Sequence, residues 1–209
     1  MAVSLARLIE AASVIPVLTV GDRDKAAPLA RALKAGGLSV IEMTLRTEAA
    51  LEVMQEMKSA EPDLIVGMGT LRTPEDVEAS VKAGADFLVS PGLTPSLGPA
   101  MLESGVVALP GVATAGEAMA AAEQGFELLK FFPAEQAGGM DYLKSLKGPL
   151  PDIRFCPTGS ITRDKAPEYL TLPNVVCVGG SWIANGAMIA AGDWETITAN
   201  ARLAADMKP

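Results

Sequence analysis

The stretch KAGADFLVSPG, residues 82–92, combines the end of a helix, a glycine, a short apolar strand and a turn. The same order of features occurs in KAGGLSVIE, residues 34–42, and in ESGVVALPG, residues 103–111. A glycine just past a helix commonly adopts the left-handed conformation that ends the helix. The glycines in this position are Gly36, Gly84 and Gly105. The repeated order of helix, glycine and strand predicts a sheet whose successive strands are connected by helices.

Short apolar runs bounded by Gly, Pro or Ser recur along the chain, as is typical of strands. The predicted strands cover residues 14–20, 38–45, 64–69, 86–90, 106–110, 127–133, 153–158 and 175–180. Helical segments are predicted at residues 25–35, 48–59, 74–83, 95–104, 115–124, 140–146 and 193–206. This alternation predicts an α/β fold, a (β/α)8 TIM barrel, as a single domain over residues 1–209. An extra N-terminal helix within residues 1–13 is expected to cover the N-terminal end of the barrel.

The alternative fold for such a pattern is an open, doubly wound sheet. That fold commonly carries a GxGxxG motif after its first strand. The residues that follow the first predicted strand here, GDRDKA at 21–26, do not match the motif. The similar size of the repeated units also favours closure into a barrel.

The composition excludes several classes of protein. The net charge is −8, and no more than two cationic residues are adjacent, so neither nucleic acid nor an anionic membrane is expected as a partner. No apolar run reaches the roughly 18 residues of a membrane span, and no signal peptide is expected. Cys156 and Cys177 each lie inside an apolar run, which indicates reduced thiols in the core of a cytoplasmic protein.

The chain contains no histidine. This excludes Ser-His and Cys-His catalysis, metal sites that depend on histidine, and histidine general bases. No cluster of other metal ligands stands out in the sequence, so neither a metal nor a cofactor is expected. Acid–base chemistry must then rely on carboxylates, lysine, tyrosine, the two thiols or water.

A single lysine interrupts the apolar run FELLKFFPAE, residues 126–135. Strand alternation places Lys130 on one face with Leu128 and Phe132. If that face points into the barrel, loss of solvent and a nearby like charge both disfavour the ammonium form. The neutral amine that results is a nucleophile that attacks ketones. The alternative is that Lys130 extends past the helices to solvent.

The second predicted strand contains polar residues at every other position. Glu42, Thr44 and Arg46 therefore share one face of IEMTLR, residues 41–46. If this face points inward, a carboxylate and a guanidinium lie in the mouth of the barrel, near Lys130. Glu42 is then the candidate base, and Arg46 the candidate partner of a substrate carboxylate. The alternative is a structural ion pair at the rim.

Loops after the strands supply the other candidates, because barrel enzymes keep their active residues at that end. Thr70 follows the third strand. Pro91 follows the fourth, either as a turn residue or as a substrate contact through its carbonyl or ring. Glycine and serine follow the last two strands, where barrel enzymes often bind phosphate through backbone N–H groups. The candidate phosphate-binding residues are Gly159, Ser160, Gly180 and Ser181. Ordinary loop glycines are the alternative.

These candidates fit metal-free Schiff-base chemistry on a phosphorylated oxo acid. Seven segments of the chain, within about residues 13–185, resemble the 2-keto-3-deoxy-6-phosphogluconate (KDPG) aldolase family. They are IPVLTV, GGLSVIEMTLRT, VGMGTL, GADFLVSPG, LPGVATAGE, KFFPAE and CPTGSI. The most specific motifs are E-x-T-x-R at 42–46 and K-F-F-P-A at 130–134.

The resemblance implies a class I aldolase that cleaves KDPG to pyruvate and glyceraldehyde 3-phosphate in the Entner–Doudoroff pathway. It implies a homotrimer, with Lys130 as the Schiff-base lysine and Glu42 as the general acid and base. The implied substrate contacts are Arg46 and Thr70, with Thr158 and Phe132 at the pyruvate part and Gly159, Gly180 and Ser181 at the phosphate.

Two departures from the family pattern are visible. Ser160 stands where many members have a second glycine, and Gly21 and Asp22 stand where several relatives carry basic residues. Related activities remain as alternatives, namely cleavage of 4-hydroxy-2-oxoglutarate (KHG) or of 2-keto-3-deoxy-6-phosphogalactonate. A more remote alternative is a barrel that binds a phosphosugar without catalysis and uses Lys130 as a counter-charge.

Overall fold

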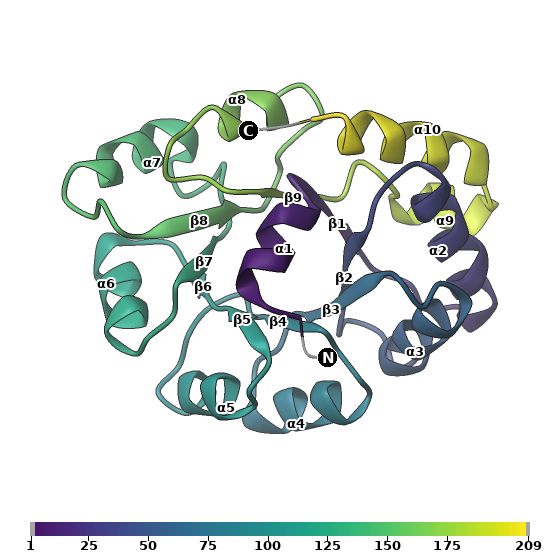
Figure 1. The fold of residues 1–209 in the computed structure, drawn as a ribbon, viewed down its shortest axis with the longest axis horizontal. Helices are drawn as coiled ribbons and strands as arrows, with labels where there is room; N and C mark the ends of the chain where they lie inside the picture. Colours follow the sequence, from purple (N-terminus) through teal and green to yellow (C-terminus); the bar gives the residue numbers. More distant parts are fainter. Residues whose placement is uncertain (1–2, 208–209) are drawn as a thin grey trace.

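The computed structural model describes residues 3–207 and shows a ring of short strands surrounded by helices (Figure 1). The strands are β1 (Val14–Leu18), β2 (Val40–Thr44), β3 (Ile65–Gly69), β4 (Phe87–Val89), β5 (Val107–Leu109), β6 (Gly111–Val112), β7 (Leu128–Phe131), β8 (Arg154–Pro157) and β9 (Val178–Gly180). The helices are α1 (Leu5–Ala11), α2 (Ala26–Ala35), α3 (Ala50–Ala60), α4 (Pro74–Lys82), α5 (Leu97–Glu103), α6 (Ala115–Glu123), α7 (Gly139–Lys147), α8 (Ala166–Leu170), α9 (Gly186–Ala191) and α10 (Trp194–Ala205), with a 3-10 turn, η1 (Arg23–Lys25).

The strands form a curled, parallel, TIM-like sheet. Six of them pair in the order β5-β4-β3-β2-β1-β9, and the other three pair in the order β6-β7-β8. The predicted fifth strand, residues 106–110, corresponds to β5, and β6 is a further short strand that begins directly after Pro110, which has no N–H for the ladder. Its carbonyl still accepts a hydrogen bond from the Lys130 N–H at 2.9 Å. Two single bridges, Phe155 with Val175 and Thr158 with Gly179, join the chain around β8 to that around β9.

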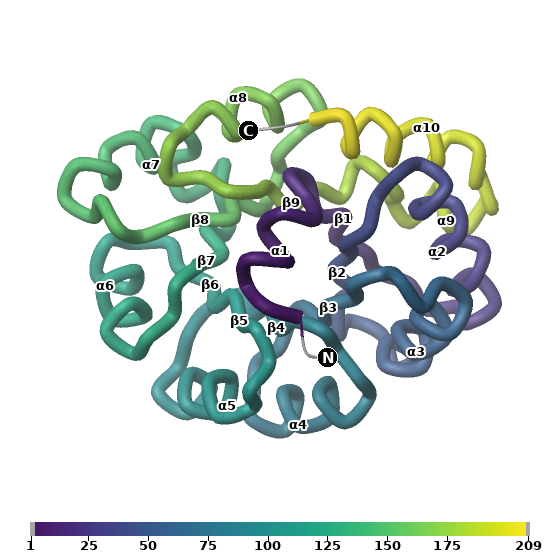
Figure 2. The backbone as a smooth tube through the Cα atoms, viewed as in Figure 1, coloured from purple at the N-terminus to yellow at the C-terminus, as the bar shows by residue number. Residues whose placement is uncertain are grey.

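The two faces of the strands bury different sets of side chains. Ile41, Met43, Leu129 and Phe131 belong to the larger cluster, which lies between the sheet and the helices. A smaller cluster fills the inside of the ring and includes Ile15, Val40, Phe87, Leu128 and both cysteines. Leu8 of α1 packs against this inner cluster, and Figure 2 shows α1 lying across the middle of the ring, as the sequence predicts. Alternation along β2 and β7 therefore directs Glu42 and Lys130 inward.

The glycine predictions are confirmed at two positions and wrong at one. Gly84 and Gly105 adopt the left-handed conformation, with φ of 92° and 69°. Gly36 has φ of −79°, and its neighbour Gly37 takes the left-handed role with φ of 95°. Gly36 serves packing instead, because a Cβ there would lie 2.4 Å from the Cβ of Ala201 in α10.

Two short helices were not predicted from the sequence. They are α8 and α9, which span five and six residues. Segments this short carry little helical periodicity, and Pro167 lies within the first of them. Of the helices in residues 3–207, none is long and apolar enough to cross a membrane.

Candidate active site

Lys130 lies in β7 with its side chain inside the ring. Its Nζ donates to Oε1 of Glu42 at 3.1 Å, and only 5% of each side chain is exposed. The lysine therefore does not extend to solvent past the helices. Its Nζ also lies 5.4 Å from the ring centroid of Phe132, within the range of a cation–π contact. The structure thus brings together three predicted site residues, from β2, β7 and the residue just after β7.

The carboxylate of Glu42 occupies its position because the neighbouring strand offers no side chain there. A Cβ on Gly69, in β3, would lie 2.1 Å from Glu42 Oε1. Real Cβ atoms do not approach other atoms this closely, so any larger residue at position 69 displaces the carboxylate or the strand. Sequence reasoning missed this role, although a glycine inside a strand is a signal of close approach.

Arg46 lies at the rim, two residues beyond the end of β2. Its side chain is exposed, and its Nε donates to Thr70 Oγ1 at 3.1 Å. Within residues 3–207 Arg46 forms no ion pair, and the charged group in contact with Lys130 is the Glu42 carboxylate. The proximity of Arg46 to Lys130 stays a prediction. Thr70 has φ of 67°, a conformation that costs a residue with a side chain about 1–3 kcal/mol. Such strained residues concentrate at functional sites.

Thr44, the third polar residue predicted on this face of β2, has a structural role. It is fully buried, its hydroxyl donates to the Leu18 carbonyl at 2.8 Å, and Thr19 Oγ1 lies 2.8 Å from the same oxygen. With its single proton donated to the backbone, Thr44 has none left for a ligand.

Thr158 presents the opposite case. The residue is 6% exposed, and its hydroxyl is buried without a hydrogen-bond partner in the described part of the chain. A Cβ on Gly179 would lie 2.3 Å from this oxygen, so the glycine leaves space beside it. A buried hydroxyl without a partner is unusual in a folded protein, and binding of a ligand is one explanation.

The loops after β8 and β9 leave the sheet side by side. The bridge between Thr158 and Gly179 brings them together. Gly159 and Ser160 follow with φ of 116° and 56°. On the other loop, a Cβ on Gly180 would lie 2.7 Å from Nε1 of Trp182, so only glycine fits without displacement. The exposed Ser181 completes the set of residues predicted to bind phosphate.

Pro91 lies at the exit of β4 and is exposed. The loop is tightly packed behind it, because a Cβ on Gly111 would lie 2.4 Å from the Pro91 carbonyl oxygen. Ser90 Oγ donates to the Gly92 carbonyl at 2.7 Å and accepts from the Gly111 N–H at 3.3 Å. The turn is therefore well supported, and its role toward a ligand stays a prediction.

The two cysteines are buried and free, and they belong to the inner cluster. Hydrogen bonding with Cys156, burial and the nearby Glu42 carboxylate raise the pKa of the Cys177 thiol well above its ordinary value. A thiol in this state is a poor nucleophile. Lys130 is therefore a better candidate for covalent chemistry than Cys177.

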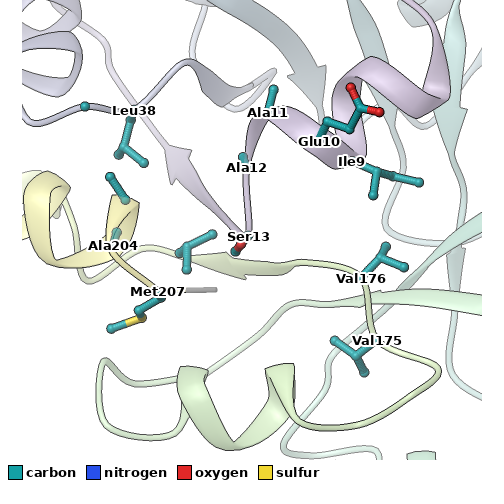
Figure 3. Close-up of a pocket in the computed structure, with 13 residues that line it drawn as sticks. Ile9, Glu10, Ala11, Ala12, Ser13, Leu38, Val175, Val176, Ala204 and Met207 are labelled. Carbon is teal, nitrogen blue, oxygen red and sulfur yellow. The ribbon is translucent and has the colours of Figure 1, made fainter. Parts of the chain in front are cut away.

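A cavity of about 590 Å³ is lined by none of the predicted site residues. Its lining includes Ser13 at the start of β1, Val176 ahead of β9 and Glu10 of α1 (Figure 3). It therefore opens at the N-terminal ends of strands, whereas barrel enzymes place their chemistry at the C-terminal ends. We do not assign the active site to it. In residues 3–207 no group of three potential acidic, thiol or imidazole ligands is arranged to hold a metal ion.

The geometry agrees with comparisons to known proteins. Residues 5–200 match the family model described as KDPG and KHG aldolase. The 2-dehydro-3-deoxy-phosphogluconate aldolase of Pseudoalteromonas atlantica is 46% identical over 91% of this chain and 89% of the relative.

Two solved structures are also similar. One is KDPG aldolase from Legionella pneumophila with pyruvate captured as a covalent carbinolamine intermediate, which is 41% identical, with a TM-score of 0.94 over 97% of this chain and 98% of that one. The other is KDPG aldolase from Zymomonas mobilis with 3-phosphoglycerate, which is 43% identical, with a TM-score of 0.92 over 97% and 95%. A match over nearly the whole chain, together with a buried lysine and carboxylate in contact, shows that the chain belongs to the KDPG and KHG aldolase family.

Proposed function

We propose that this protein is a class I aldolase that cleaves KDPG to pyruvate and glyceraldehyde 3-phosphate through a Schiff base on Lys130. The observation that carries the proposal is the contact of 3.1 Å between Lys130 Nζ and Glu42 Oε1 in the interior of the ring. A lysine buried beside a carboxylate can pass its proton to it and become a neutral nucleophile. The covalent pyruvate carbinolamine in the Legionella relative supports this chemistry in the family.

The first half of the reaction forms the Schiff base. Glu42 accepts a proton from the Lys130 ammonium, and the free amine attacks the C2 ketone of the substrate. The carbonyl π electrons move to oxygen, and a proton passes from the attacking nitrogen to that oxygen to give a neutral carbinolamine. Glu42 then returns its proton to the hydroxyl, which leaves as water, and the nitrogen lone pair forms the iminium. The contact already present supports Glu42 in both transfers, because the two side chains are within hydrogen-bond distance.

The second half breaks the carbon–carbon bond. Glu42 removes the proton of the C4 hydroxyl, directly or through water, as the C3–C4 electron pair moves into the iminium. The products are glyceraldehyde 3-phosphate and an enamine. Protonation of the enamine at C3 and addition of water release pyruvate and regenerate Lys130. General acid–base catalysis of this kind contributes roughly 10²- to 10⁴-fold.

The two ends of the substrate fit the two parts of the rim. Arg46, Thr70 and the Thr158 hydroxyl, which has no partner within residues 3–207, suit the carboxylate and ketone end, since each offers a hydrogen-bond donor. Pro91 and Phe132 complete that end of the proposed site. Gly159, Ser160, Gly180 and Ser181 suit the phosphate, because glycine allows close approach of backbone N–H groups to an anion. The 3-phosphoglycerate in the structure of the Zymomonas relative supports binding of a phosphorylated ligand.

Cleavage of KHG to pyruvate and glyoxylate is a second candidate activity. The matching family model covers aldolases for both substrates, which favours this addition. The chemistry at Lys130 and Glu42 is the same, since both substrates carry a C2 ketone and a C4 hydroxyl. KHG has no phosphate, so the two substrates differ in their use of the loops after β8 and β9.

We also propose that the two sheets complete a (β/α)8 barrel. The bridges from Phe155 to Val175 and from Thr158 to Gly179 support closure on one side, and the bond from Lys130 N–H to the Pro110 carbonyl supports it on the other. A single domain over residues 1–209, a homotrimer without a cofactor and a cytoplasmic location stay predictions. They rest on the family resemblance and, for the location, on the two free thiols.

The experiment that tests the proposal is trapping with borohydride. Incubation with pyruvate and borohydride should add the mass of a reduced pyruvate adduct to the peptide that contains Lys130, and KDPG should be cleaved. Lys130→Met should give neither adduct nor turnover, whereas Lys144→Met, at an exposed lysine of α7, should behave as wild type. Turnover without an adduct at Lys130 would rule out the proposed mechanism.

A further inference from the structure

Ser160 lies in a strained position and is held there by one side chain. Its φ of 56° is uncommon for a residue other than glycine. Nε2 of Gln136 donates to Ser160 Oγ at 2.9 Å, and both residues are exposed. Gln136 is located just after β7, the strand of Lys130, while Ser160 follows β8.

The direction of this hydrogen bond decides what the serine can do. A hydroxyl has one proton and two lone pairs. When the Gln136 amide occupies a lone pair, the proton remains available for an acceptor on the open side of the loop. We propose that Gln136 is a positioning residue that holds the Ser160 hydroxyl as a donor to the substrate phosphate. This inference rests on the proposed function, because it assumes that the loop binds phosphate.

The loop that carries Gln136 is fixed to the phosphate loop by other bonds. The Ala134 N–H donates to the Thr158 carbonyl at 2.8 Å, and the Glu135 N–H donates to the Gly159 carbonyl at 3.4 Å. The Glu135 carboxylate also accepts hydrogen bonds from Tyr169 and Lys165. Gln136 therefore starts from a backbone that is already positioned against Ser160, so only the rotamer freedom of its side chain is lost when it bonds the serine.

The charges of the loop after Ser160 are engaged elsewhere. Arg163 pairs with Asp164 at 3.4 Å, and Lys165 pairs with Glu135. Both pairs are partly exposed and weaken the attraction of these cations for a phosphate only in part. Neutral donors add to that attraction, and hydrogen bonds to a charged group are stronger than those between neutral groups. The Ser160 hydroxyl is such a donor, and Gln136 determines its orientation.

The test compares two substrates that differ in the phosphate. Gln136→Leu should raise KM for KDPG about three- to tenfold, the effect of weakening the Ser160 bond to the phosphate by about as much as one typical hydrogen bond. It should leave kcat and KM for KHG unchanged, since KHG carries no phosphate. Gln55→Leu, at an exposed glutamine of α3, is the matched control and should change neither. An equal rise of KM for both substrates, or no rise for KDPG, would overturn the proposal.

Two further measurements separate this proposal from a general effect on structure. In a Ser160→Gly background the Gln136→Leu change should have no additional effect, because the hydroxyl it orients is gone; additive effects would contradict the proposal. Calorimetric binding of 3-phosphoglycerate should weaken by the same factor in Gln136→Leu, without any need for turnover. If wild type binds 3-phosphoglycerate but cleaves no KDPG, the proposed function fails, while the binding data still test the role of Gln136.

Discussion

Lys130 and Ser160 lie at opposite ends of the same candidate site, and their surroundings differ. Lys130 and Glu42 are 5% exposed and come from β7 and β2, so strand alternation and close packing fix their directions. Ser160 and Gln136 are exposed and come from loops, and bonds between the loops hold them. The interior end is therefore determined by the sheet, whereas the outer end can vary without disturbing the sheet.

This difference separates chemistry from recognition. A change at the interior end should alter the rate of imine formation with any 2-oxo acid, because every such substrate reacts at Lys130. A change at the outer end should alter the preference between phosphorylated and unphosphorylated substrates. Substitutions can test whether the two ends are independent, and the expected effects decrease from the interior to the outer loops.

The largest effect is expected from a substitution at Gly69, which packs against the Glu42 carboxylate at the interior end. Gly69→Ala would place a Cβ 2.1 Å from Glu42 Oε1 and displace the carboxylate from Lys130. We expect kcat to fall about 10²-fold, the lower range for loss of a general acid–base group, and stability to fall by about 1–3 kcal/mol from overpacking. Steady-state kinetics with KDPG and urea denaturation measure the two effects.

A matched control for Gly69 is available on the surface. Gly116→Ala, in α6, adds a Cβ with nothing within 4 Å and should leave kcat unchanged. Binding of 3-phosphoglycerate should be the same in both variants if the two ends are independent. A Gly69→Ala variant with normal kcat would show that the position of Glu42 is not critical.

Smaller effects are expected at Thr158, which lies between the two ends: the protein should become more stable, while its binding of substrate should become weaker. Thr158→Val removes a buried hydroxyl that has no partner in residues 3–207. The free energy of unfolding should rise by about 1 kcal/mol, because the cost of burying an unpaired hydroxyl is removed. KM for KDPG and KHG should rise together, about fivefold, as a hydrogen bond to the common part of both substrates is lost.

Thr44→Val is the contrasting substitution. It removes a hydroxyl that donates to the Leu18 carbonyl at 2.8 Å, so it should destabilise the protein by about 1 kcal/mol. Thermal or urea unfolding of both variants checks the predicted signs. If Thr158→Val destabilises the protein as Thr44→Val does, the Thr158 hydroxyl is satisfied in the free protein and its assignment to the substrate loses its support.

The interior end could be predicted from the sequence because strand periodicity carries the information. Alternation in IEMTLR and in FELLKFFPAE directed Glu42 and Lys130 to one interior, and the structure confirms that they meet. The bond from Arg46 to Thr70 was not predicted, because β2 ends at Thr44 and strand alternation does not fix a side chain beyond that point. The end of β5 before Pro110 follows from the missing N–H of that proline.

The outer end was harder to predict from the sequence, because loop contacts depend on backbone conformations that follow no sequence periodicity. Nothing in the sequence pairs Gln136 with Ser160, which are 24 residues apart. Gly69 lies inside β3 and is paired with Thr44, so its close approach to Glu42 Oε1 depends on the conformation of the Glu42 side chain, which the sequence does not give. Gly36 likewise serves the packing of α10, an element far away in the chain.

The smallest expected effect concerns Glu135, which lies in the chain between Lys130 of the interior end and Gln136 of the outer end. Hydrogen bonds from Lys165 and Tyr169 lower the pKa of the Glu135 carboxyl below its ordinary value. A carboxyl whose pKa is lower in the folded state stabilises the protein above its unfolded pKa, about 4.3, and loses that contribution as the pH falls through the folded value. Glu135→Gln should therefore be less stable than wild type at pH 7, and the difference should vanish in acid.

Urea unfolding of wild type and Glu135→Gln over a series of pH values measures this difference. Glu127→Gln is the control, because Glu127 is largely exposed and contacts Arg154 only at 3.6 Å, a surface pair of little energetic value. A difference that is constant with pH would contradict the assigned cause. Borohydride trapping of pyruvate should be as fast in Glu135→Gln as in wild type. A slower adduct would show that the loops also position Lys130, and the two ends of the site would then not be independent.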